Sequence, residues 1–95
     1  MAEAVSVQFG KGWTKIGGEK LRHATQKRVY NERGRLLMWT VNLINEKHET
    51  VATIMVRDGF PQHARVFKTR GIYGSLSADA QLRLARDIAK RRFEQ

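Results

Sequence analysis

The chain of 95 residues carries 18 lysines and arginines against 9 aspartates and glutamates, which gives a formal net charge of +9. A chain of this length buries roughly 60–65% of the surface of its unfolded state, so we expect one domain, residues 1–95, with one core. The absence of cysteine excludes disulfides, a thiolate nucleophile and a cysteine-ligated zinc. The surplus of positive charge predicts an anionic partner, and nucleic acid is the commonest polyanion in a cell.

The N-terminal segment MAEAVSVQFG has neither the positive start nor the long apolar run of a signal peptide. No other segment approaches the ~20 consecutive apolar residues that a membrane-spanning helix needs. We therefore expect a soluble, cytoplasmic protein that does not contact a membrane. Residues 1–4 are expected to form a loose N-terminal end.

The segment before position 31 predicts strands. Apolar and polar residues alternate from position 5 to position 9, and glycines at positions 10 and 12 offer a turn into a second short strand at 13–16. Between positions 19 and 30 the apolar residues form a poor helical stripe, and the ending QKRVY favours a strand. We predict that this strand begins at about Thr25, and we leave 19–24 unassigned.

The clearest strands lie between Arg35 and Gly59. Trp39, Val41 and Leu43 alternate with their neighbours, which is the period of two that a pleated strand imposes. The segment 50–56 is rich in β-branched residues and contains no proline. Five polar residues at 45–49 predict the turn that joins the two strands.

The strand at 36–44 is apolar on both faces, whereas a single helix can cover only one of them. Either the N-terminal segment 5–16 packs on the second face, or a second copy of the protein does. We expect a homodimer on this ground.

The last third of the chain predicts a turn, an edge strand and a helix. The turn is the DGFP sequence at 58–61, and the edge strand at 64–69 carries charges that discourage aggregation. Ser77 suits a helix N-cap, and Asp79 lies in the first turn, where a negative charge favours the helix dipole. The apolar face that should join the core consists of Ala78, Leu82, Leu84, Ala85, Ile88, Ala89 and Phe93.

Together these elements predict an α+β fold. We expect an antiparallel β-meander of about four strands, packed by one C-terminal α-helix. If the short strands at 5–9 and 13–16 pair with each other, they form an additional N-terminal hairpin.

The basic residues fall into three groups. The densest run, between positions 20 and 35, is opposed only by Glu32 and predicts a surface that tracks phosphates. A second group lies on the edge strand, and a third, Arg83, Arg86 and Lys90, lies on a helix where aspartates four residues away should neutralise part of the charge. The residues that we expect to contact nucleic acid are Lys20, Arg22, Lys27, Arg28, Tyr30, Arg33, Arg35, Arg65, Lys68, Arg70 and Trp13.

Aromatic side chains flanked by basic residues can stack on unpaired bases, and each such contact contributes ~1–3 kcal/mol. Trp13, Tyr30, Phe67 and Tyr73 have such neighbours. Trp39 lies in an apolar run and is expected in the core. For Trp13, core or dimer packing explains the residue as well as base stacking does.

No motif predicts a catalytic, metal or cofactor site. The glycine-rich segment 10–20 departs from the phosphate-binding loop, because Gly18 stands where that loop needs lysine. The three histidines are too scattered to ligate a metal, and each is expected to be solvated. His63, close to Arg65 and preceded by Asp58, is the one cluster whose groups could move a proton during phosphate chemistry.

These observations favour a small, non-enzymatic nucleic-acid-binding protein with a regulatory or accessory role, whose contacts to DNA or RNA, single strands included, are dominated by the backbone. The order of strands followed by one helix is similar to that of sheet-based binders of single-stranded nucleic acid such as the Whirly type, a likeness of element order alone. The second hypothesis is a small RNA-cleaving enzyme. Toxins of the RelE type are similarly short, basic and sheet-rich, but they begin with helices that this sequence does not predict. The third is a phage- or plasmid-type inhibitor or adaptor that binds an acidic protein surface.

Overall fold

The computed structural model describes residues 5–94, and the side chains of residues 5–91. Six strands form one antiparallel meander in the order β1-β2-β3-β4-β5-β6, and two helices follow them. The elements are β1 (Val7–Gly10), β2 (Trp13–Ile16), β3 (Glu19–Tyr30), β4 (Leu36–Ile44), β5 (Thr50–Arg57), β6 (Phe60–Phe67), α1 (Gly71–Gly74) and α2 (Ala78–Glu94). The α+β class and the N-terminal hairpin are confirmed, and the meander has six strands instead of about four. The expectation for residues 1–4 lies outside the described residues.

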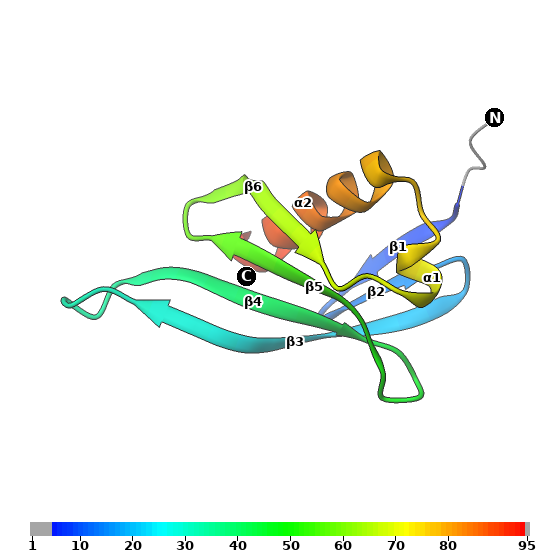
Figure 1. Cartoon of the computed structure of the whole chain (residues 1–95), viewed down its shortest axis with the longest axis horizontal. Helices are drawn as coiled ribbons and strands as arrows, with labels where there is room; N and C mark the ends of the chain where they lie inside the picture. The colour runs from blue at the N-terminus through cyan, green and yellow to red at the C-terminus, as the bar shows by residue number, and fades with distance from the viewer. Residues whose placement is uncertain (1–4, 95) are drawn as a thin grey trace.

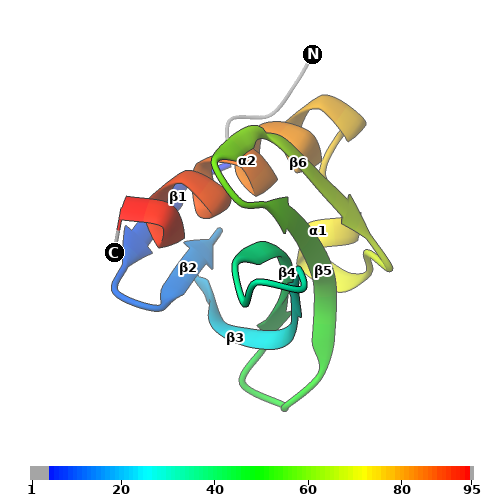
Figure 2. The same ribbon diagram turned by 90° about the vertical axis from the view of Figure 1, so that its left-hand side faces the viewer.

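The sheet curls into a half-barrel, and α2 lies across its open side (Figure 1, Figure 2). Along its length α2 packs against β6 and, to a lesser extent, β5. Near the other end, the guanidinium of Arg91 lies 4.0 Å from the ring centre of Phe9 in β1. The helix therefore contacts both edge strands of the sheet. Within residues 5–94, neither helix combines the length and the apolarity that a bilayer crossing needs.

The concave face of the half-barrel, which is turned toward α2, holds the core. In β4, Trp39, Val41 and Leu43 are buried, and each pairs across the ladder with a buried residue of β5. The buried side chains of α2 are Leu84, Ala85, Ile88 and Ala89, so the expected place of the helix in the core is confirmed. Burial of one large aliphatic side chain contributes ~1.5–3 kcal/mol to the stability of the fold.

The ends of the predicted apolar stripes lie outside this core. Leu37 belongs to the same alternating series as the buried residues of β4. It is nevertheless exposed, because it lies near the tip of the β3–β4 hairpin, which projects beyond α2 (Figure 1). Ala78 and Leu82 of α2 are exposed as well. The side chain of Phe93 lies outside the described residues.

β3 is longer than its sequence predicts. It begins at Glu19 instead of about Thr25 and runs for 12 residues. Its first part pairs with β2, its second part pairs with β4, and Arg22 is in register with residues of both strands. The neighbouring strands therefore supply order that the local sequence does not signal. Gln26 is accommodated between Thr25 and Lys27 as an extra residue, a β-bulge.

The region after β5 also differs from the expectation. β6 begins at Phe60 instead of Ala64, so the reversal needs only Asp58 and Gly59. A proline in this strand is compatible with its place at the edge of the sheet. Nothing in the sequence predicts α1, whose Tyr73 is fully buried and donates a 2.6 Å hydrogen bond to the carbonyl of Gln81. Burial raises the pKa of Tyr73 above its ordinary value of 10.0.

The predicted turn at 45–49 is confirmed, and the turn at 31–35 on the other side of β4 has the same geometry. Their sequences are NERGR at 31–35 and NEKHE at 45–49. In each turn, the side chain of the asparagine at the first position accepts hydrogen bonds from the backbone amides of the residues at the third and fifth positions. The fourth residue takes a positive φ, 79° at Gly34 and 63° at His48. Glycine adopts this conformation freely, whereas histidine is strained in it.

The N-terminal hairpin does not cover the second face of β4. β2 pairs with the edge of β3 and β1 pairs with β2, so both strands continue the sheet beyond β3. Of the two alternatives for covering this face, the packing of segment 5–16 on it is therefore wrong, and the homodimer stays a prediction. Met38 and Thr40 on that face remain partly exposed.

Candidate nucleic-acid interface

The strand register gathers basic residues on the convex face of the sheet, which is turned away from the core. Thr14 and Ile16 of β2 are buried, so their neighbours Trp13 and Lys15 point to the opposite side. Residues paired across a ladder share a face, and the same argument extends from β2 to β6. The convex face carries Lys15, Lys20, Arg22, Lys27, Arg57 and Arg65, which we call the basic face.

The basic residues flank a band of neutral side chains. One row across the strands starts at Lys27 in β3 and ends at Arg65 in β6, with Thr40 and Met55 between them. Three strand spacings of ~4.8 Å separate the backbones of the two ends by about 14 Å. This leaves room for a polymer chain to lie between Lys27 and Arg65.

None of the described acidic residues lies on the basic face. Glu19 pairs with the buried Ile16 and so belongs to the concave side, and the others lie in turns or in α2. Among the described lysines and arginines, only Arg70 has a carboxylate within 4.0 Å, that of Glu49. Both partners are exposed, so this ion pair contributes little to stability. The described carboxylates therefore do not neutralise the cations of the basic face by ion pairs.

Trp13 forms a fixed aromatic surface on the basic face. Its indole covers the backbone of Gly10 so closely that a Cβ atom at Gly10 would overlap the ring. Lys20 Nζ lies 5.1 Å from the ring centre, within the range of a cation–π interaction. Phe67, the ladder partner of Thr53, is a second ring on the same face and is exposed, whereas Trp13 is half-buried. Both rings can offer a flat apolar surface beside positive charge.

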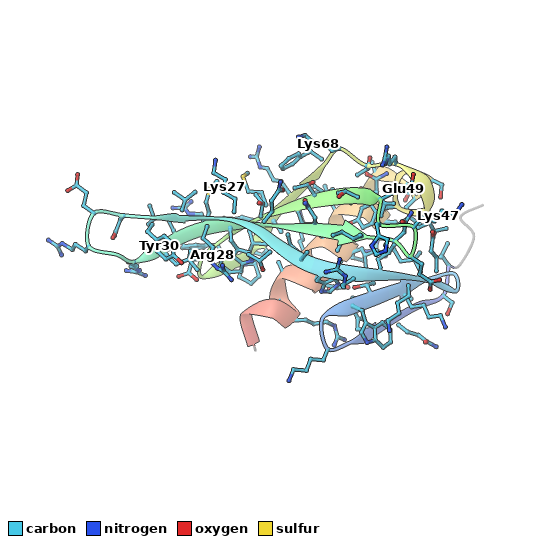
Figure 3. All side chains as sticks on the ribbon, turned by 90° about the horizontal axis from the view of Figure 1, so that it is seen from below. Lys27, Arg28, Tyr30, Lys47, Glu49 and Lys68 are labelled. Carbon is cyan, nitrogen blue, oxygen red and sulfur yellow. The ribbon has the colours of Figure 1, made fainter. Side chains whose placement is uncertain are left out.

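The dense basic run between positions 20 and 35 does not form one surface. Extended backbone sends consecutive side chains to opposite sides, and Figure 3 shows Lys27 and Arg28 on opposite sides of β3. Tyr30, at the end of β3, is exposed on the same side as Arg28 (Figure 3). Arg33 and Arg35 lie in the β3–β4 turn. The expected contact residues that do lie on the basic face are Trp13, Lys20, Arg22, Lys27 and Arg65.

The remaining expected contacts follow β6. Lys68 takes a φ of 56° just after the strand and lies on the same side of the sheet as Lys27 in Figure 3. Arg70 is held by Glu49 and also donates a 3.0 Å hydrogen bond to the carbonyl of Thr50. Arg70 therefore fastens the β4–β5 turn to α1. Tyr73 is wrong as a stacking candidate, because it is fully buried.

The helical group remains separate from the sheet. Arg83, Arg86 and Lys90 are exposed on α2. Neither aspartate of α2 forms the expected ion pair within 4.0 Å in the described part of the chain. Arg91, one of the expected partners, covers the ring of Phe9 instead.

Two residues of the basic face were missed by sequence reasoning. Lys15 lies between the buried Thr14 and Ile16, and Arg57 follows the buried Val56. Strict alternation along each strand would have placed both on the convex side. Neither residue belongs to a dense basic run. The other residues of the basic face were predicted because basic residues are dense around them in the sequence.

An open groove of about 1030 Å³ lies beside the β3–β4 and β5–β6 hairpins and reaches α2. We call it the hairpin-end groove. It is lined by three exposed apolar side chains, Leu37, Phe60 and Leu82. Its basic lining residues are Arg35, Arg57, Arg65 and Arg86, and its acidic lining residue is Asp58.

The three histidines have three different environments. His23 is partly buried and its Nε2 lies 2.6 Å from the hydroxyl of the buried Thr14, so the expectation that it is solvated is wrong. His48 is exposed in its turn, and His63 stacks on Phe60 in the hairpin-end groove. No three metal-ligating side chains come together among the residues that the structure describes.

No family model, curated protein or solved structure matches this chain. Its function must therefore be inferred from its own geometry and charge. That geometry provides a cationic surface without ion pairs among the described residues, with the rings of Trp13 and Phe67 on it, and a groove that combines apolar, aromatic and guanidinium groups. Such a surface can hold a polyanion without covalent chemistry.

Proposed function

We propose that this protein binds nucleic acid, DNA or RNA, through the basic face of its sheet. The observation that carries the proposal is the gathering of unpaired cations on one face that has no described carboxylate. Each lysine or arginine that docks on a phosphate releases condensed counterions, so several such contacts give strong and salt-sensitive binding. The contacts are dominated by the backbone, and the role is accessory or regulatory, within the cytoplasm.

The rings on the same face support a contribution from bases. Trp13 is held flat over Gly10 with Lys20 beside it, and Phe67 is exposed near the other edge. Aromatic rings next to cations are the usual platforms of proteins that bind single strands. The charge on its own would serve a duplex equally well.

The test is fluorescence anisotropy with single-stranded and duplex DNA and RNA over a series of salt concentrations. We expect log K to fall linearly with log salt, with a slope of about −0.7 per neutralised phosphate for a single strand. Lys27→Ala should reduce the magnitude of that slope by about 0.7, while Arg83→Ala, an exposed change on α2, should leave it unchanged. Absence of binding, or binding that salt does not weaken, would overturn the proposal.

The expected homodimer stays a prediction, and it competes with this proposal for the same surface. Two copies joined through their convex faces would bring Arg22 and Lys27 of one against the cations of the other, and like charges in contact are unfavourable. We therefore expect nucleic acid to occupy this face, and any dimer to form elsewhere. Sedimentation with and without oligonucleotide tests this, because a dimer through the convex face would dissociate on binding.

A second candidate function is RNA cleavage, and one observation favours it. His63 and Arg65 line the hairpin-end groove together with Asp58, so groups that could transfer a proton and stabilise a phosphorane share one depression. If this function is real, the protein cleaves single-stranded RNA, and His63→Ala abolishes cleavage but not binding. Intact RNA after prolonged incubation with the native protein would exclude it.

A further inference from the structure

The hairpin-end groove exposes apolar side chains that the core does not use. Leu37 of β4, Phe60 of β6 and Leu82 of α2 are 44%, 40% and 36% exposed, and all three line the groove. They come from positions far apart in the sequence, and the fold brings them to one depression. Large apolar residues gathered on a surface indicate a binding site.

The charge around these residues selects the kind of ligand. Four arginines line the groove against the single described carboxylate of Asp58. Among the described residues, none of these arginines has a carboxylate within 4.0 Å. A ligand with apolar or flat groups and a surplus of negative charge fits this lining, whereas a neutral or cationic ligand would leave the guanidinium groups without partners.

Planar groups are stacked within the groove. The rings of Phe60 and His63 are nearly parallel, with 8° between their planes and 5.5 Å between their centres. The guanidinium carbon of Arg57 lies 4.9 Å from the ring centre of Phe60. Aromatic rings and guanidinium planes are the surfaces on which proteins stack splayed-out bases. An acidic peptide offers charge to this groove but few flat groups.

The groove is continuous with the basic face. Arg57 and Arg65 belong to both, since they lie on the convex side of the sheet and also line the groove. A phosphate chain that lies across Lys27 and Arg65 can therefore continue into the groove between arginines. The volume of about 1030 Å³ is at the upper end of the ~300–1,000 Å³ that small-ligand pockets occupy, enough for more than one base.

We propose that the hairpin-end groove binds unpaired bases of a single-stranded nucleic acid. The inference rests on the proposed function, and it adds a second site and names the form of the nucleic acid. Phosphates on the basic face provide most of the affinity, and the groove provides the preference for a single strand. A duplex cannot use the groove, because its bases are stacked and paired within the helix.

The test compares oligonucleotides that carry the same phosphates but differ in their bases. The probes are a thymidine DNA strand of about 15 nucleotides, an abasic strand of equal length, and a duplex, each measured by anisotropy at one salt concentration. DNA is used because it lacks the 2′-hydroxyl that RNA cleavage needs. The groove variant is Phe60→Ser with Leu82→Ser, and the matched control is Val5→Ser with Val7→Ser, two exposed residues at the opposite edge of the sheet.

We expect the native protein and the control to bind the thymidine strand ~10-fold or more tighter than the abasic strand, a ratio typical of one stacked base. The groove variant should lose most of this preference for the thymidine strand and keep the native salt slope. Leu82→Ser alone, on an exposed flank of α2, should lower the ratio in the same direction if the double variant does not fold. Thermal melting monitors folding in each case.

Three outcomes would overturn the inference. A native protein that binds the two strands equally, with a steep salt slope, would leave the basic face as the whole site. A groove variant that keeps the full preference would assign the base contacts to Trp13 and Phe67 alone. Binding of polyglutamate that is lost in the groove variant, together with oligonucleotide binding that is retained, would assign the groove to an acidic protein. Failure of every oligonucleotide to bind would instead overturn the proposed function itself.

Discussion

The concave and convex faces of the sheet are built from alternate residues of the same strands, yet their chemistry is opposite. In β2, Thr14 and Ile16 are buried while Trp13 and Lys15 lie outside, and in β5 the buried Val56 precedes the exposed Arg57. The concave face provides the burial that stabilises the fold. The convex face carries positive charge, and none of its cations forms an ion pair with a described carboxylate. Stability and binding should therefore respond to different substitutions, and each prediction below tests this separation.

The largest effect is expected on the concave face. Ile88 of α2 is completely buried, so Ile88→Ala should lower the free energy of unfolding by ~2–5 kcal/mol through lost burial and the cavity that remains. Urea denaturation measures the loss. Arg83→Ala on the exposed side of the same helix should change stability by no more than ~0.5 kcal/mol. An equal effect of the two would remove α2 from the core.

At β1, the backbone of Gly10 lies against the ring of Trp13, so one substitution there should affect both stability and binding. Gly10→Ala places a Cβ atom where the indole of Trp13 lies, so the ring must move away from the convex surface. We expect a loss of ~1–3 kcal/mol in stability from overpacking, and weaker binding of single strands. Gln8→Ala on the same strand should do neither. Unchanged melting and binding in Gly10→Ala would show that the ring is not held there.

Tyr73 anchors the segment that leads into α2. Tyr73→Phe removes the hydrogen bond to the Gln81 carbonyl and should cost ~0.5–1.5 kcal/mol, with nucleic-acid binding unchanged. The pKa of Tyr73 is higher in the folded state, so its contribution is present below pH 10.0 and declines as pH rises further, since only the unfolded phenol ionises readily. Native stability should therefore fall more steeply above pH 10.0 than that of the variant. Parallel curves would contradict the burial of the phenol.

The smallest effect is expected in the turns, which belong to neither face. His48 holds a φ of 63° where the equivalent turn has Gly34, so His48→Gly should raise stability by ~0.5–1 kcal/mol through relief of strain. Gly34→Ala should have the opposite sign. Neither substitution should alter binding. Thermal denaturation of the two variants, in parallel with the native protein, measures both shifts.

The sequence predicted those elements whose pattern is local. Alternation identified β4 and β5, the polar residues at 45–49 identified their turn, and the apolar stripe with Ser77 before it identified α2. Ser77 indeed accepts a 3.2 Å hydrogen bond from the amide of Ala80. These signals lie within a few residues of one another, so a single sequence shows them.

Features that depend on neighbours could not be predicted in this way. The first half of β3 has no clear period, and it becomes a strand because β2 and β4 bond to it. The density of basic residues between positions 20 and 35 predicts a single surface, but an extended backbone places Lys27 and Arg28 on opposite sides of β3 (Figure 3). The hairpin-end groove joins Leu37, Phe60 and Leu82 from three elements, and no spacing in the sequence relates them.

The most direct test of the central claim separates the position of charge from its amount. One triple variant, Lys20→Ala, Arg22→Ala and Lys27→Ala, removes three cations of the basic face. The other, Lys11→Ala, Lys47→Ala and Arg83→Ala, removes three exposed cations from two turns and α2, so both lose the same charge. Anisotropy with a single-stranded oligonucleotide should show the salt slope fall in magnitude by about 2 in the first variant and stay near the native value in the second. Equal losses in the two variants would mean that net charge, and not the basic face, binds the nucleic acid.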